Sequence, residues 1–70
     1  MYIVLELQAA PGNVAHLFET FAERDAAESR FHAVLAAAAV SQVPEHSALL
    51  MTSDGQVLRS ECYRHGGEKT

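Results

Sequence analysis

The sequence predicts an α+β fold with the element order β-β-α-β-β, in which one helix packs on one face of a four-stranded antiparallel sheet. Three features predict it: alternating apolar residues at the N-terminus, an alanine-rich run that stops before Pro44, and the turn-forming pair Asp54-Gly55 between two apolar segments. We expect residues 1–65 to form this single domain and residues 66–70 to be a flexible polar tail.

The first strand is predicted over residues 2–8, because apolar side chains alternate there with more polar ones. Pro11 and Gly12 come shortly afterwards. Proline presets φ and glycine accepts positive φ, so these two residues predict a turn and a hairpin. The alternating apolar residues of the strand are Ile3, Leu5 and Leu7.

Residues 14–21 fit two structures, because their apolar positions also match the spacing of an amphipathic helix. The choice depends on the residues that follow. Asp25 and Glu28 resemble a capping box, which would start the helix only after this segment. We therefore interpret residues 14–21 as the second strand, with a helix as the alternative.

One helix is predicted from residue 26 to about Ser41, since the run is rich in helix formers and Pro44 cannot continue it. One buried face is enough for one sheet, yet the C-terminal half is apolar on every side. We expect the second, alanine-lined face to meet another copy of the chain; the alternative is that these alanines are merely exposed helix formers. That face includes Ala33, Ala36 and Ala37.

Size and composition favour a cytoplasmic homo-oligomer. A domain of this length buries only about 60% of its unfolded surface. With Cys62 as the one cysteine, no internal disulfide can compensate. The net charge of −4 and the scattered arginines disfavour duplex nucleic acid as a partner. The first residues resemble neither a signal peptide nor a membrane span, so we expect no membrane partner.

The second hairpin sets the register of the candidate site. A two-residue Asp54-Gly55 turn joins predicted strands at residues 46–52 and 57–65 and pairs Thr52 with Val57. This register places two rows of side chains on opposite faces. The row expected to face the helix is Ser47, Leu49, Met51, Leu58, Ser60 and Cys62. The row expected on the open face contains His46, Arg59, Glu61, Tyr63 and His65.

The second row is our candidate ligand site, because imidazole, phenol, carboxylate and guanidinium groups together can bind a polar ligand. The alternative is an ordinary wet sheet face. His32 and Ser41, on the predicted helix, are expected to join the site across a subunit interface; for both, a purely local structural role is the alternative.

We expect no cofactor and no metal. A metal site would need His32, His46, His65 and Glu61, but the chain has no paired ligand spacing such as CxxC or HxxxH. Catalysis by Cys62 is disfavoured, because a free cysteine in a helix-facing row usually just packs.

The pattern AExxFHxxLAxAxxS at residues 27–41, followed by His46-Ser47, Gly55 and ExYxH at residues 61–65, resembles a group of uncharacterised small proteins from bacteria, prophages and phages. The resemblance implies a stand-alone accessory protein. It also suggests, by analogy with small oligomeric phage proteins, that the chain sequesters a nucleotide-like signal.

The sequence thus predicts a non-catalytic, homo-oligomeric ligand-binding module. Two alternatives stay open. One is a protein-interaction module that uses the exposed sheet face or an edge strand. The other is a small hydrolase or isomerase in which a histidine and Glu61 transfer protons.

Overall fold

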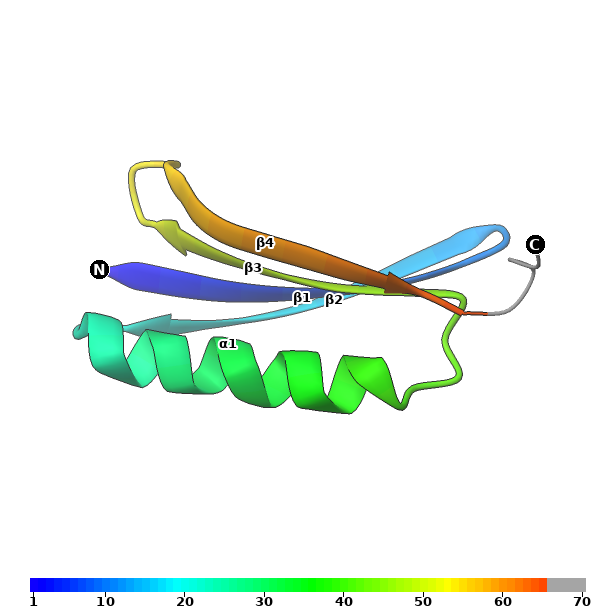
Figure 1. Cartoon of the computed structure of the whole chain (residues 1–70). Helices are drawn as coiled ribbons and strands as arrows, with labels where there is room; N and C mark the ends of the chain where they lie inside the picture. Colours follow the sequence, from blue (N-terminus) through cyan, green and yellow to red (C-terminus); the bar gives the residue numbers. More distant parts are fainter. Residues whose placement is uncertain (66–70) are drawn as a thin grey trace.

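The computed structural model describes residues 1–65 and contains four antiparallel strands and one helix (Figure 1). The sheet order is β2-β1-β3-β4, and α1 lies on one face. The predicted fold class is therefore confirmed, whereas the prediction for residues 66–70 lies outside the described residues. The elements are β1 (Tyr2–Ala10), β2 (Asn13–Phe21), α1 (Arg24–Ala39), β3 (Glu45–Thr52) and β4 (Val57–Arg64).

The first hairpin forms where the sequence predicts it. β1 and β2 pair without interruption from Tyr2 opposite Phe21 to Ala10 opposite Asn13. Gly12 closes the turn with a φ of 80°, a conformation that glycine adopts without strain. The strand interpretation of residues 14–21 is confirmed, since pairing with β1 overrides the local helical spacing.

The helix begins earlier than the predicted capping box. Its N-cap is Glu23, whose side chain makes no capping hydrogen bond, so the predicted cap by Asp25 and Glu28 is wrong. The Glu28 side chain instead contacts Arg24 and Arg59, and it is therefore not available to the helix terminus. The helix ends at Ala39, two residues before the predicted end.

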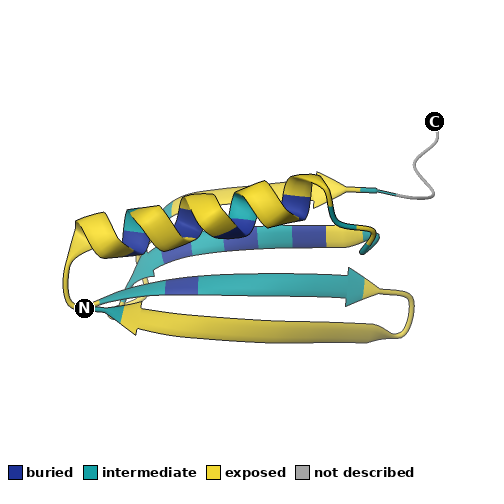
Figure 2. Cartoon of the chain, turned by 90° about the horizontal axis from the view of Figure 1, so that it is seen from below, coloured by how far each residue is buried: buried dark blue, intermediate teal, exposed yellow. Residues whose placement is uncertain are grey.

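The core lies between α1 and the central strands. Phe31 and Leu50 are its largest fully buried side chains, and burial of each contributes about 1.5–3 kcal/mol. Ala27, Ala38 and Ala48 are fully buried as well, and their small side chains let the helix approach the sheet closely. Seen from the helix side, α1 runs above β3 and leaves β2 uncovered (Figure 2).

The second hairpin has a longer turn than predicted. The Thr52 N–H donates to Gln56 O at 2.9 Å, and the Gly55 N–H donates to Thr52 O at 3.0 Å. Gly55 has a φ of 99°, which fits a three-residue loop with a glycine at its end. Thr52 thus pairs with Gln56, and the predicted two-residue turn is wrong.

A bulge then restores the predicted register. Val57 pairs with Met51, but the next pair is Arg59 with Leu50, so Leu58 is the extra residue. The extra loop residue and the bulged residue offset each other. From Leu50 to His46 the pairing is therefore the predicted one, including His46 opposite Tyr63.

The predicted choice of faces is wrong. His46, Ala48 and Leu50 are buried on the helix side, so by alternation Leu49 and Cys62 lie on the open face. The prediction followed hydrophobicity and placed the bulkier residues under the helix. The structure follows shape, because Ala48 leaves room for Phe31. Of the row that was expected to face the helix, Leu58 does contact the core, through the bulge.

Candidate functional site

The predicted polar row lies on the helix side of the sheet and does not form one open site. Its members, together with His32 and Ser41, separate into three structural groups. The groups centre on Glu6, on Glu28 and on the C-terminal end of α1, and each has its own hydrogen bonds or ion pairs.

The first group is a polar cluster beneath the helix. His46 Nε2 donates to Glu6 Oε2 at 2.5 Å, and Gln8 Nε2 donates to the same oxygen at 3.0 Å. Burial raises the pKa of the Glu6 carboxyl, but these two hydrogen bonds and the nearby positive charges outweigh it and hold that pKa below its ordinary value. His46 Nδ1 is buried and has no hydrogen-bond partner among residues 1–65. The pair contributes to the packed interior rather than to an open surface.

Glu6 and Gln8 were missed by the sequence reasoning. Their alternation with Val4 was visible and places all three on one face of β1. The missing information was the sheet order. β1 lies beside β3, with Gln8 directly opposite His46, and this pairing brings residues 40 positions apart into hydrogen-bond contact.

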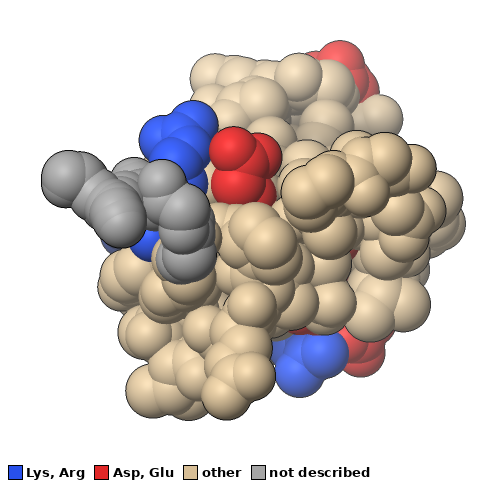
Figure 3. All heavy atoms as spheres, turned by 90° about the vertical axis from the view of Figure 1, so that its right-hand side faces the viewer, with Lys and Arg blue, Asp and Glu red and all other residues tan. Residues whose placement is uncertain are grey.

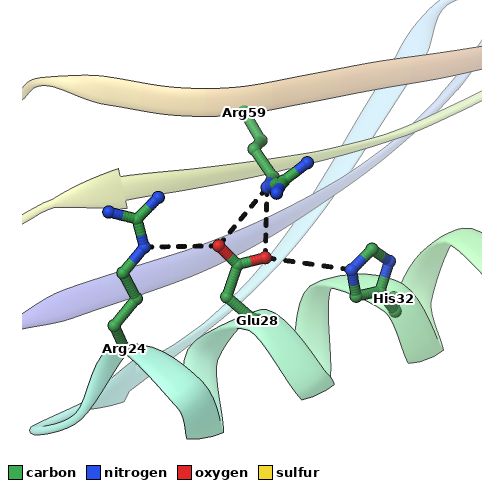
Figure 4. A network of polar contacts seen from close by, with 4 residues as sticks. All are labelled: Arg24, Glu28, His32 and Arg59. Atoms are coloured by element: carbon green, nitrogen blue, oxygen red, sulfur yellow. Dashed lines mark hydrogen bonds and ion pairs between the residues drawn. The ribbon is translucent and has the colours of Figure 1, made fainter.

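The second group centres on Glu28, which faces two guanidinium groups and one imidazole (Figure 4). Its carboxylate lies 3.3 Å from Arg24 Nε, 3.1 Å from Arg59 Nε and 3.8 Å from His32 Nε2. Burial raises the pKa of Glu28, but the two arginines outweigh it and lower that pKa. Arg59 and His32 are thus engaged by a helix residue. Arg30 pairs separately, with Glu19 at 3.1 Å.

The third group holds the C-terminal end of α1. His65 Nε2 donates to Ala38 O at 2.8 Å and so satisfies one of the last helix carbonyls. The His65 ring also stacks on Tyr63, with centroids 6.2 Å apart and an interplanar angle of 4°. Ser41 Oγ accepts a hydrogen bond from the Val43 N–H at 3.0 Å, which is the local role given above as its alternative.

Arg59, Glu61 and Tyr63 are the members of the row that are exposed on β4. Arg59 is held in its ion pair with Glu28. Of the predicted constellation, a ligand in solution can directly reach these three side chains, the stacked His65 ring and His32, whose side chain is 63% exposed.

A shallow groove runs on the helix side where α1 leaves β2 uncovered. It contains a small cavity of about 40 Å³ and a neighbouring hollow of about 170 Å³, which share Glu6 and Leu17. Pockets for drug-sized molecules usually hold about 300–1,000 Å³, so the groove is small for such a ligand. The cavity is lined by Val4, Glu6, Leu17, Phe18, Glu19, Arg30 and Val34.

The described part of the chain has neither a cluster of metal-binding side chains nor a helix that could cross a membrane. Residues 1–65 contain no group of three or more His, Cys, Asp or Glu side chains arranged to hold a metal ion. Over the same residues, no helix combines the length and the apolar character needed to span a membrane.

The open face of the sheet is the largest feature that the sequence reasoning missed. Cross-strand pairing aligns Phe18, Leu5 and Leu49 in one row on this face, and Ile3 and Met51 in the next. Among the described residues, charged side chains on this face come only at one end, where Glu45 pairs with Arg64 at 3.5 Å. The view from the end that carries the β1–β2 turn shows mostly neutral atoms, with charges in small separate patches (Figure 3).

The pairing and alternation could have revealed this face, had the helix been assigned to the other side.

Comparison of the chain with protein-family models, curated proteins and solved structures gives no match. The site is therefore interpreted from its own geometry, which offers one apolar sheet face, one uncovered edge strand and a stacked aromatic pair.

Proposed function

We propose that the chain is a non-catalytic binding module that acts as a homo-oligomer, with the open face of the sheet as its main contact surface. The observation that carries the proposal is the composition of that face. Antiparallel sheets covered on one side normally present polar residues to water on the other. Here the central positions are large aliphatic or aromatic residues: Ile3, Leu5, Leu7, Phe18, Leu49 and Met51.

The dimensions of the face suit a second copy. Strands of this length at a spacing of about 4.8 Å outline a surface of roughly 500 Å². Two such faces would bury roughly 1,000 Å² in total, the lower limit for a specific interface. A two-fold axis brings each face against itself, which requires that like charges do not meet. The uncharged centre of this face meets that requirement.

The alanine face of α1, which the sequence favoured for assembly, is exposed as well. Alanine side chains bury little apolar area, whereas each buried Leu, Ile or Phe contributes about 1.5–3 kcal/mol. We therefore place the main contact on the sheet. The helix face is the alternative contact, and the variant Val40→Lys, described next, tests it.

Native mass spectrometry and sedimentation of the purified chain test this proposal. We expect an oligomer, and we expect Leu5→Asp to lower its mass by placing a charge at the centre of the contact. The matched control is Val40→Lys, which adds a charge at a residue 84% exposed on the helix side. A wild-type monomer at all concentrations would refute the proposal, and so would dissociation by the control alone.

Cys62 supplies a second readout that needs no mutation. Its thiol is exposed on the open face of a single copy. If this face is the contact, the rate of maleimide labelling should rise several-fold when the protein is diluted below the dissociation constant of the oligomer. A labelling rate that is independent of protein concentration would contradict the open face as the contact.

A second candidate function is binding of a planar, nucleotide-like ligand, and the stacked rings of Tyr63 and His65 favour it. An aromatic pair with one ring face exposed is a platform on which a base can stack, and Glu61 follows the same row. The test is titration with adenine and guanine nucleotides, monitored by the NMR signals of both rings. Unchanged signals at millimolar nucleotide would exclude this site.

A further inference from the structure

The sheet has two edges, and they differ in how they are protected. A strand at an edge presents unpaired N–H and C=O groups that can pair with another chain. Proteins usually block such pairing with charged side chains, bulges or short edge strands. In this sheet the edges are β2 and β4, so each can be compared with those devices.

The β4 edge carries two of the protective devices. It is interrupted by the bulge at Leu58, and charged residues recur along it at Arg59, Glu61 and Arg64. Arg59 and Arg64 are also fixed in ion pairs with residues outside β4. Pairing of another strand along this edge would have to displace or bury these charges.

The β2 edge has neither device along most of its length. It pairs with β1 over nine residues without a register shift. Glu19 is its one charged residue. Val14 and Leu17 are each 62% exposed, and Phe18 is 65% exposed. α1 leaves most of β2 uncovered (Figure 2) and reaches it through the ion pair of Arg30 with Glu19, so both sides of the edge have room for another strand along the rest of its length.

The sequence of β2 is also compatible with pairing to itself. An antiparallel pair centred on Leu17 places Leu17 opposite Leu17 of the second copy, and His16 opposite Phe18. Each residue then pairs with a residue an even number of positions away, and such residues point to the same side of a strand. The helix side of one sheet therefore continues into the helix side of the other. Glu19 falls opposite Ala15, and therefore no like charges lie directly opposite each other.

From these observations we propose that β2 pairs antiparallel with β2 of a second copy across a two-fold axis, forming one continuous sheet of twice the width. The contact uses main-chain hydrogen bonds and apolar pairs on both sides of the edge. It is made by the main chain of the edge strand and shares Phe18 with the open face, but it needs no contact between two open faces and so does not rest on the function proposed above. If both contacts form, they close into a tetramer with two kinds of two-fold interface.

The decisive variant is Leu17→Lys, because lysine on an exposed edge is a natural block to strand pairing. We expect it to halve the mass of the wild-type assembly in sedimentation and native mass spectrometry. Val40→Lys is the control for added charge and should leave the mass unchanged. An unchanged mass for Leu17→Lys would overturn the proposal, and so would dissociation by Val40→Lys alone.

Combination with Leu5→Asp separates this proposal from the open-face proposal. If both hold, the wild type is a tetramer, each single variant is a dimer and the double variant is a monomer. If only the edge contact exists, the wild type is a dimer, Leu17→Lys is a monomer and Leu5→Asp remains a dimer. If only the open-face contact exists, the wild type is a dimer, Leu5→Asp is a monomer and Leu17→Lys remains a dimer.

Hydrogen exchange of the wild type gives an independent test that does not depend on any variant folding. In an unpaired edge strand, alternate amides point to solvent and exchange rapidly. We expect all central amides of β2, from residue 15 to residue 19, to be protected, while alternate amides of β4 exchange fast. Fast exchange of alternate β2 amides at high protein concentration would refute the pairing.

Discussion

The two faces of the sheet depart from a simple amphipathic pattern, in which the covered face is wholly apolar and the open face is polar. The face under α1 holds Ala48 and the Glu6 and His46 pair alongside its large apolar residues. The uncovered face holds a row that contains Leu5 and Leu49. Small residues let the helix approach closely, whereas the larger aliphatic residues remain on the surface. The difference indicates that the helix packs on the face with small residues, and it is the reason why the function proposed above places its contact on the second face.

Neighbouring leucines on β3 give the largest test of this difference. Leu50 is fully buried under the helix, so Leu50→Ala should cost about 2–5 kcal/mol of unfolding free energy. Leu49 lies on the opposite face, and Leu49→Ala should cost less in a monomer. Urea unfolding monitored by circular dichroism measures both variants.

Protein concentration sharpens the result. The loss caused by Leu50→Ala should be the same at every concentration, because the contact lies within one chain. The loss caused by Leu49→Ala should grow with concentration if the open face binds a second copy. Equal losses for the two variants at all concentrations would remove the distinction between the faces.

Glu6 and its partners give the next largest effect. Glu6→Gln removes a charged acceptor whose side chain is only 13% exposed, and hydrogen bonds to charged groups contribute about 1.5–3 kcal/mol each. The folded-state pKa of Glu6 lies below its ordinary value of 4.5. Its contribution is therefore complete above pH 4.5 and is lost as pH falls through the lower folded-state pKa.

Unfolding free energies measured from pH 7 down to pH 3 test this prediction. The wild type should lose more stability than Glu6→Gln over the acidic part of the range. Glu61→Gln is the matched control, because the Glu61 carboxylate is exposed. If the curves of the wild type and Glu6→Gln are parallel, the Glu6 carboxylate does not stabilise the covered face.

The sequence was sufficient for the elements and their order but not for the faces. Alternation, the Pro11-Gly12 turn and Pro44 are local signals, and each identifies an element or its end. The face covered by the helix depends on the fit between Phe31 and the sheet, which no local pattern contains. The face of the candidate site was predicted wrongly for the same reason, although the members of its row were identified correctly.

The longer turn illustrates a different limit. Asp54-Gly55 indicated a hairpin correctly, but glycine at a positive φ fits both a two-residue turn and a three-residue loop. The bulge at Leu58 then offset the extra residue. The predicted pairing of His46 with Tyr63 was therefore right although the turn on which it was based was wrong.

The smallest predicted effect concerns Glu28, at the rim of the covered face. Its partners Arg24 and Arg59 are each about half exposed (51%), so water and salt screen the pairs much more than they screen Glu6. Glu28→Gln should lower the urea midpoint slightly at low salt, and the loss should vanish near 1 M salt, where the screening length is about 3 Å. The loss in Glu6→Gln should persist there, because its hydrogen bonds are part-buried. If both losses vanish in salt, the cluster beneath the helix is as accessible to solvent as the rim, and the centre of the covered face differs from its rim less than their burial indicates.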